Sequence, residues 1–161
     1  MNSQYNADIE RLYLQLYDRM FIYARCTLKN DVLAEEAVQE TFRIACQKPE
    51  ELLNSQRPEG WLINTLKNVL ANMIRNRAVA NRIFSEYVAA QAQDYAVSED
   101  RMSFEILYEN ITDMEEFQLL KEMVIEGKSH LEMAQKRGIS VPAIKKRIQR
   151  AKEVLRKKIK I

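Results

Sequence analysis

Helix breakers are few in this chain, and they separate segments whose apolar residues recur with helical spacing. The sequence has three glycines and three prolines among its 161 residues. Between these breakers, apolar side chains return every three or four residues, which places them on one face of an α-helix. No segment shows the strict alternation that is typical of a half-buried strand. The sequence therefore predicts an all-α protein whose helices end near the breakers.

Three of these amphipathic patterns lie in the first half of the chain. Their apolar stripes cover residues 9–24, 33–45 and 62–74. We expect Asn30 or Asp31 to cap the second helix and Pro49 to end it. Pro58 is expected to begin the third helix, whose stripe is wide enough for the centre of a small bundle. A first helical domain is thus predicted over residues 5–82.

Charged residues are segregated along the chain, although its net charge is only +2. Residues 60–85 contain four basic side chains and no acid, and residues 136–161 contain eleven basic side chains and one acid. Between these two basic blocks, residues 86–116 carry nine acids and one arginine. The basic blocks favour salt-dependent binding to phosphates. The acidic segment lacks a strong apolar stripe and predicts a partly extended linker over residues 83–111.

Residues 112–161 form the predicted second domain, which contains a helix-turn-helix. Ser129 and Glu132 have the spacing of a capping box and are expected to begin a short helix. Gly138 can adopt the left-handed conformation that a tight turn between helices requires. Ser140 is then expected to cap a second helix. The predicted architecture is therefore two small helical domains joined by an acidic linker.

The helix after Ser140 separates apolar from basic side chains. Its apolar stripe consists of Val141, Ile144, Ile148, Ala151 and Leu155. Long polar side chains lie off this stripe: Lys145, Lys146, Gln149 and Arg150. A helix with one apolar and one cationic face can pack on its own domain and enter a DNA major groove. This pattern predicts DNA binding.

The sequence offers no candidate for a catalytic centre or a resident cofactor. His130 is the sole histidine and has no neighbouring cluster of metal-ligating residues, so no metal site is expected. Cys26 and Cys46 fall on helical patterns without metal-type spacing, and we expect them to be buried or half-buried reduced thiols. Neither a signal-peptide pattern nor an apolar run of membrane length is present. The sequence thus predicts a cytoplasmic protein that is not an enzyme and does not insert into membranes.

Three segments resemble helices of bacterial RNA polymerase sigma factors. Residues 31–42, DVLAEEAVQETF, resemble the helix that binds core polymerase. Residues 60–72, GWLINTLKNVLAN, are similar to the helix that melts promoter DNA. Residues 138–156, GISVPAIKKRIQRAKEVLR, resemble the terminal helix that reads the upstream promoter element. The segments occur in the order and spacing of the sigma-70 family, and two domains without a large insert resemble its extracytoplasmic-function (ECF) class.

The resemblance implies contact residues for three partners. For the clamp helices of the largest subunit of core RNA polymerase, the implied contacts are Glu36, Gln39, Glu40 and Phe42. For the −10 promoter element they are Lys67, Asn68, Asn72, Arg75 and Arg77. For the −35 element they are Lys145, Lys146, Arg147, Gln149, Arg150 and Lys152. Arg147 and Lys152 are expected to contact phosphates, which position a protein on DNA without specifying the sequence.

Two aromatic residues near these sets have structural alternatives. By its spacing alone, Phe42 fits a core position as well as a polymerase contact, and the acids beside it would then only be solvated. Trp61 is the only tryptophan and suits a base-stacking platform. Its place at the start of an apolar stripe favours core packing instead.

The resemblance implies a sigma factor that binds core RNA polymerase and directs promoter-specific initiation of transcription. An anti-sigma factor is a common partner in this class. The alternative is a sigma-like DNA-binding regulator that keeps the fold but does not initiate transcription. A simple helix-turn-helix regulator has no need of the surface around Glu40 or of the face that carries Asn68 and Asn72, so the first domain separates the two hypotheses.

Overall fold

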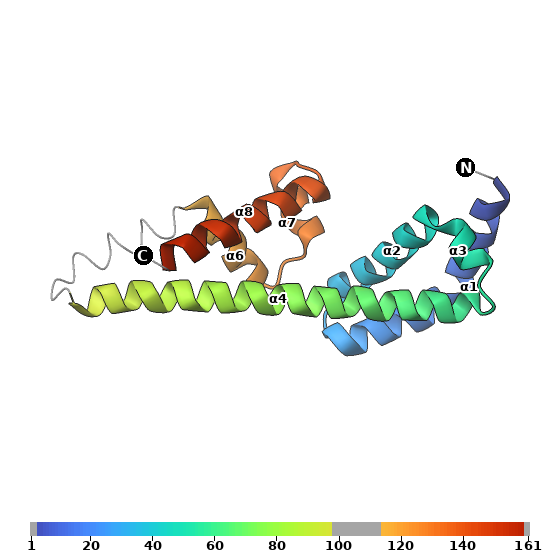
Figure 1. Cartoon of the computed structure of the whole chain (residues 1–161), viewed down its shortest axis with the longest axis horizontal. Coiled ribbons are helices and arrows are strands. Elements are labelled where there is room, and N and C mark those ends of the chain that lie inside the picture. The colour runs from blue at the N-terminus through green and yellow to red at the C-terminus, as the bar shows by residue number, and fades with distance from the viewer. Residues whose placement is uncertain (1–2, 98–113, 160–161) are drawn as a thin grey trace. The chain divides into compact units, whose positions relative to one another are not determined.

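The computed structural model describes residues 3–97 and 114–159 of the chain (Figure 1). Within these ranges every regular element is an α-helix, which confirms the predicted all-α class. The helices are α1 (Ser3–Leu28), α2 (Asp31–Gln47), α3 (Pro49–Leu53), α4 (Pro58–Val97), α6 (Glu115–Val124), α7 (His130–Arg137) and α8 (Val141–Ile159). The chain divides into two compact units, Met1–Arg75 and Asn76–Ile161, and the division falls inside α4.

The first unit is built from α1, α2, α3 and the beginning of α4. Lys29 adopts a left-handed φ of 54° between α1 and α2. Asn30 caps α2 as predicted, because its Oδ1 accepts a hydrogen bond from the backbone N of Leu33 at 3.0 Å. α2 ends at Gln47, ahead of Pro49, which also agrees with the prediction. Pro49 opens the short α3, an element that the sequence pattern does not predict.

The predicted stripes of the first unit meet in one apolar core. Its large side chains with almost no exposure are Leu16, Met20, Leu52, Leu62 and Leu66. α2 adds small residues to this core, including the fully buried Ala34 and Ala37. Small side chains let neighbouring helices pack closely, so the core fixes α2 and the first turns of α4. These two helices carry the residues predicted to contact polymerase and the −10 element.

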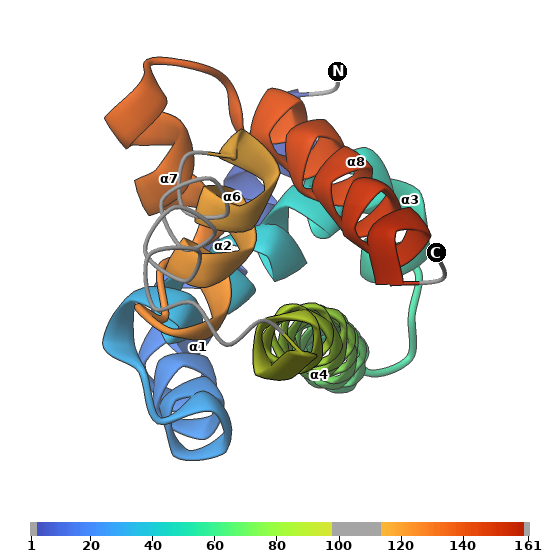
Figure 2. The same cartoon turned by 90° about the vertical axis from the view of Figure 1, so that its left-hand side faces the viewer.

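The second unit is built from the rest of α4 together with α6, α7 and α8, and Figure 2 shows these helices in a view along α4. Up to residue 90, where its side chains are described, α4 contributes four buried side chains to this core: Ala80, Ile83, Phe84 and Tyr87. The Phe84 ring stacks on Phe117 of α6 with 5.1 Å between the ring centroids. The second half of α4 is therefore part of this core.

This packing corrects the predicted linker. Residues 83–97 continue α4 as helix, whereas the sequence predicts a partly extended segment over residues 83–111. The four buried α4 residues recur with helical spacing, but their stripe is too short to stand out among the surrounding acids and alanines. Their burial against α6 stabilises the helix, as tertiary packing commonly does. The rest of the predicted linker, residues 98–111, lies outside the described residues.

The predicted turn chemistry around α7 and α8 is present. The Ser129 Oγ accepts a hydrogen bond from the Glu132 N at 3.1 Å, and the Glu132 Oε1 accepts one from the Ser129 N at 3.4 Å. Gly138 ends α7 with a left-handed φ of 64°. The Ser140 Oγ then accepts from the Ala143 N at 3.2 Å at the start of α8. These two helices and their short turn have the local geometry predicted from the sequence.

The two cysteines lie at the surface, which corrects the prediction of buried or half-buried thiols. Cys26 and Cys46 are free and exposed. Cys46 directly follows the buried Ala45 and therefore leaves the core-facing stripe of α2, and Cys26 lies two positions after the buried Ala24 of α1. None of the described helices combines the length and the apolar character needed to cross a bilayer.

Candidate nucleic-acid interface

The outer surface of α2 presents the predicted polymerase-binding carboxylates. Glu36 and Glu40 are half-buried, and Gln39 is exposed. Glu40 forms a bidentate ion pair with Arg43, with its two carboxylate oxygens 2.6 and 2.7 Å from guanidinium nitrogens. The hydrogen bonds and the charge of Glu40 raise the pKa of Arg43. Gln39 donates to the Glu35 Oε1 at 3.4 Å. Because Arg43 lies beside these carboxylates, the surface carries both signs of charge.

Phe42 lies in the core of the first unit. Its side chain is only 6% exposed, and its ring packs edge-on against Tyr13 with 4.9 Å between the centroids. The structure therefore supports the alternative that the sequence left open, in which Phe42 fixes the position of α2. The polar residues of the predicted set are the ones that remain at the surface.

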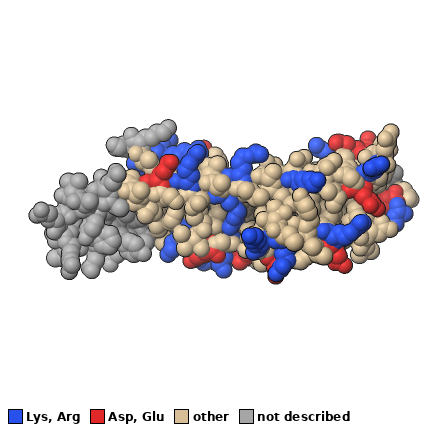
Figure 3. Space-filling model, turned by 90° about the horizontal axis from the view of Figure 1, so that it is seen from below, with Lys and Arg blue, Asp and Glu red and all other residues tan. Residues whose placement is uncertain are grey.

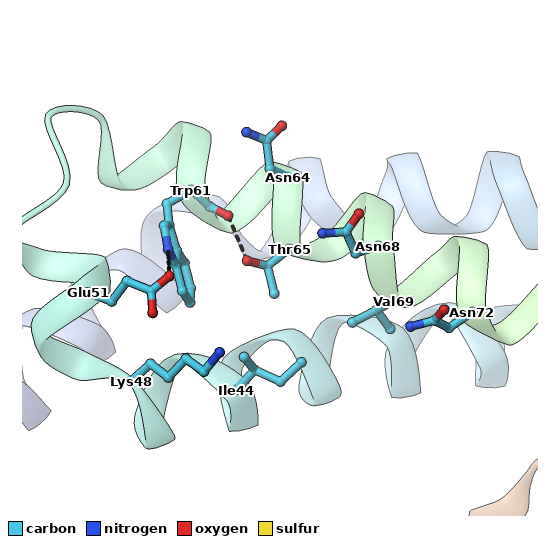
Figure 4. A pocket seen from close by; sticks show the side chains of 9 residues that line it. All are labelled: Ile44, Lys48, Glu51, Trp61, Asn64, Thr65, Asn68, Val69 and Asn72. Carbon is cyan, nitrogen blue, oxygen red and sulfur yellow. Dashed lines mark hydrogen bonds between the residues drawn. The ribbon is translucent and has the colours of Figure 1, made fainter.

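A groove runs along α4 in the first unit (Figure 4). Its volume is about 360 Å³. It is lined by Ile44, Lys48, Glu51, Trp61, Asn64, Thr65, Asn68, Val69 and Asn72. The amides of Asn64, Asn68 and Asn72 recur at intervals of four residues, which aligns them along one side of the helix. Amide, carboxylate and ammonium groups thus meet an apolar floor in one concave surface.

Trp61 stands at one end of this groove and also packs on the core of the first unit. Its side chain is half-buried and packs on the first core, as the sequence pattern favours. Its indole Nε1–H donates a hydrogen bond to the Glu51 Oε1 at 3.3 Å (Figure 4). This bond fixes the ring between α3 and α4, and the ring also lines the groove.

The other residues predicted for the −10 element divide between the two units. Lys67 is exposed but is not among the residues that line the groove. Arg75 is exposed, and its Nη1 donates to the Asn72 Oδ1 at 3.2 Å. Arg77 belongs to the second unit, where its Nη2 donates to the Met123 carbonyl oxygen at 3.0 Å. The predicted set is therefore brought together only in part.

Seven of the nine groove residues were absent from the predicted set, among them Lys48, Glu51 and Asn64. Asn64 lies four residues before Asn68, so the repeated amide spacing along α4 is a signal that could have found it. Lys48 and Glu51 come from the α2–α3 junction and α3, and only the packing of the first unit brings them to α4. No sequence spacing encodes that approach.

α8 separates its basic face from its core face as predicted. The exposed side chains of the set predicted for the −35 element are Lys145, Lys146, Arg147, Gln149 and Arg150. Arg147 is an exception among them, because its Nη1 lies 3.3 Å from the Glu115 Oε1 in an ion pair. Figure 3 shows Lys and Arg side chains interspersed with Asp and Glu on the face drawn, in each unit.

Lys152 differs from the rest of this set. Its side chain is 9% exposed, and burial followed by the charge of Arg156 lowers its pKa. A buried ammonium does not present itself to a DNA backbone as a surface lysine does. The phosphate contact at Lys152 stays a prediction, and the structure shows that most of this side chain is covered.

A buried ion pair holds α7 against α6 in the second unit. Glu122 is 5% exposed, and Arg137 binds it in bidentate fashion with nitrogen–oxygen distances of 2.9 and 3.0 Å. Lys136 adds a third contact at 2.8 Å. Burial alone raises the pKa of Glu122, but the hydrogen bonds from Arg137 and Lys136 outweigh it and lower this pKa below its ordinary value. The carboxylate thus stays charged and fixes the helix that precedes the turn to α8.

Comparison with known proteins agrees with the geometry of the first unit. Residues 12–79 match the family model of sigma-70 region 2. No curated protein sequence matches the chain. The matched range contains all nine residues that line the groove. In the described part of the chain, no cluster of three or more His, Cys, Asp or Glu residues is arranged to hold a metal ion. Over residues 12–79 the chain is therefore similar to region 2 of the sigma-70 family.

Proposed function

We propose that this protein is an initiating sigma factor of the ECF class, with −10 recognition in the first unit and −35 recognition on α8. The single observation that supports this most is the groove, because it lies wholly within the residues that match region 2. Opening a duplex requires a surface that captures unstacked bases. Amides that pair with base edges and a ring on which a base can stack meet that requirement.

In this proposal the polar face of α2 holds core polymerase. Glu36, Gln39 and Glu40 contact the clamp helices of the largest subunit, and the buried Phe42 keeps α2 in place. The Glu40–Arg43 ion pair fixes the direction of one carboxylate. A charge pair of defined geometry favours a specific partner more than it adds to affinity.

Within the groove, Asn68 and Asn72 hydrogen-bond to bases of the opened strand. Asn64 extends the same row of amides by one turn, and Arg75 and Lys67 attract the DNA backbone beside it. Each amide offers both a donor and an acceptor, so it can hydrogen-bond to the edge of any base. The strength of these bonds differs between bases, which gives the groove a sequence preference. The groove therefore contributes both to opening and to sequence preference.

The exposed face of α8 contacts the upstream element. Lys145, Lys146, Gln149 and Arg150 are long donors that reach base edges in a major groove, and Arg147 contacts phosphate when it leaves Glu115. An anti-sigma factor is the further partner that we propose for a member of this class. The protein needs no cofactor for these roles.

Run-off transcription with purified core polymerase tests the proposal. We expect the wild-type chain to start transcripts at sites that share a two-element motif on a library of genomic fragments. The double variant Asn68→Ala/Asn72→Ala should bind core polymerase normally but open promoters at least tenfold less. Asn81→Ala is the matched control, because Asn81 is an exposed asparagine of α4 outside the groove. If the wild-type chain binds DNA but starts no transcript, the protein is instead a sigma-like regulator.

A further inference from the structure

One cation on the exposed face of α8 is bonded to an acid of another helix. The Arg147 Nη1 donates to the Glu115 Oε1 of α6 at 3.3 Å, across 32 positions of the chain. Phe117, two residues after Glu115, is buried in the second core. Ile144 and Ile148, which precede and follow Arg147 on α8, are buried in the same core. The packing of α6 on α8 therefore holds Glu115 within reach of Arg147.

This ion pair is of a kind that can be broken without disturbing the fold. A single nitrogen–oxygen contact joins Arg147 and Glu115, whose side chains are 44% and 61% exposed. By contrast, Arg137 holds the buried Glu122 through two contacts, of 2.9 and 3.0 Å. Exposed ion pairs add little to stability, whereas breaking a buried pair is costly. Arg147 can therefore exchange its carboxylate for another oxyanion, while Arg137 stays bound.

A DNA phosphate and a carboxylate compete for the same donors of an arginine. Both are oxyanions that accept hydrogen bonds from the planar guanidinium group. Arg147 reaches a phosphate only by giving up Glu115, and the freed carboxylate then lies near the negative charge of the DNA. Binding of Arg147 to phosphate thus has a cost that the other exposed cations of α8 do not have.

We propose that Glu115 withholds Arg147 from DNA whose sequence α8 does not recognise, and is thereby a specificity-determining residue. On the recognised upstream element, contacts of Lys145 and Gln149 to base edges hold α8 in the major groove and offset the loss of the ion pair. On unrelated DNA these contacts are missing, and Arg147 remains on Glu115. The inference rests on the proposed function, in which the exposed face of α8 contacts DNA.

The salt dependence of binding to unrelated DNA tests this inference. We would measure the affinity of the full chain for a short duplex of unrelated sequence by fluorescence anisotropy over a range of salt concentrations. Each phosphate contact adds about 0.9 to the slope of log K against log salt concentration. Glu115→Gln frees Arg147 for one more contact, so its slope should be steeper than that of the wild type by about 0.9. Its affinity at a fixed low salt concentration should rise by up to about fivefold, the factor that corresponds to an exposed ion pair.

Glu116→Gln is the matched control for the loss of charge. Glu116 lies in the same first turn of α6 as Glu115, so both variants lose one acid near the helix N-terminus. Glu116 forms no ion pair with any described residue, and its variant should bind the duplex as the wild type does.

A double-mutant cycle shows whether Glu115 acts through Arg147. Arg147→Gln alone should leave the slope on unrelated DNA unchanged, because the wild-type arginine is already held by Glu115. Glu115→Gln should have no effect in the Arg147→Gln background. Both residues are exposed, so the variants are expected to fold, which circular dichroism checks.

The outcomes separate this inference from the proposed function. A wild-type chain that binds the duplex, with an unchanged slope and affinity in Glu115→Gln, overturns the inference and leaves the DNA-binding role of α8 in place. An equal rise in Glu116→Gln, or a rise that persists in the Arg147→Gln background, also overturns it, because net charge alone then explains the gain. If neither the wild type nor Glu115→Gln binds any duplex, the proposed role of α8 is wrong and the inference falls with it.

Discussion

Replacing Glu122 by Gln should destabilise the second unit while leaving the first unit unchanged. The substitution keeps the size of the side chain and one acceptor oxygen, but it removes the charge that Arg137 and Lys136 face. Removing one partner of a buried ion pair typically costs about 3–5 kcal/mol. The Arg137 side chain is 18% exposed and also donates to the Met133 carbonyl at 3.3 Å, which relieves part of that penalty. We therefore expect a loss of about 2–3 kcal/mol.

The chain provides a matched control and a probe for each unit. Glu115→Gln breaks the ion pair between Glu115 and Arg147, whose side chains are 61% and 44% exposed, respectively. Because this pair lies at the surface, its loss should cost less than about 1 kcal/mol of stability. Trp61 is the only tryptophan and lies in the first unit, so its fluorescence follows the unfolding of that unit in urea. Circular dichroism follows the helices of both units. Glu122→Gln should move the dichroism transition to lower urea concentration and leave the fluorescence transition in place.

The dependence of this effect on pH gives a second check. Because the folded-state pKa of Glu122 lies below its ordinary value of 4.5, its contribution to stability is complete above that value. The contribution is lost as pH falls through the lowered pKa, so the difference between wild type and Glu122→Gln should shrink below pH 4.5. If Glu122→Gln costs no more than Glu115→Gln at pH 7, the ion pair of Glu122 does not stabilise the second unit.

Three further substitutions or fragments test other parts of the structure. The pKa of His130 is lowered from 6.5 to about 4 in the folded protein, so the unfolded state binds the proton first as pH falls. The free energy of unfolding should therefore decrease between pH 6.5 and pH 4, by about 3 kcal/mol at most. His130→Gln should flatten this part of the urea-stability profile. Gly138→Ala places a side chain at a φ of 64° and should cost about 1 kcal/mol in thermal unfolding. A fragment of residues 76–161 should show a cooperative melt by circular dichroism, whereas residues 112–161 should not, because they lack the α4 side chains of the second core.

The features that the sequence predicted well are the ones that depend on near neighbours in the chain. Asn30 caps α2, and Ser129 pairs with Glu132 at the start of α7, because each bond joins residues only three positions apart. Gly138 takes its left-handed conformation for an equally local reason. The apolar stripes of α1, α2 and α8 also follow directly from helical periodicity.

The features that the sequence did not predict depend on residues far apart in the chain. Phe84 and Tyr87 form only a short stripe among alanines and acids. They are core residues because both rings contact Phe117 of α6. Lys48 and Glu51 reach the groove through the packing of α3, which no periodicity encodes. The sequence also gives no sign of the bond between Arg77 and Met123, which are 46 residues apart.

Burial, rather than charge alone, distinguishes the basic residues that can contact DNA. Arg75 and Arg77 belong to the same basic block, yet Arg75 is exposed beside Asn72 and Arg77 bonds to the backbone of α6. In the last block, Lys145 is exposed and Lys152 is almost fully buried. A count of basic residues treats these pairs as equal, although only an exposed cation can approach any phosphate of the DNA backbone. The exposed set should therefore govern the salt dependence of DNA binding.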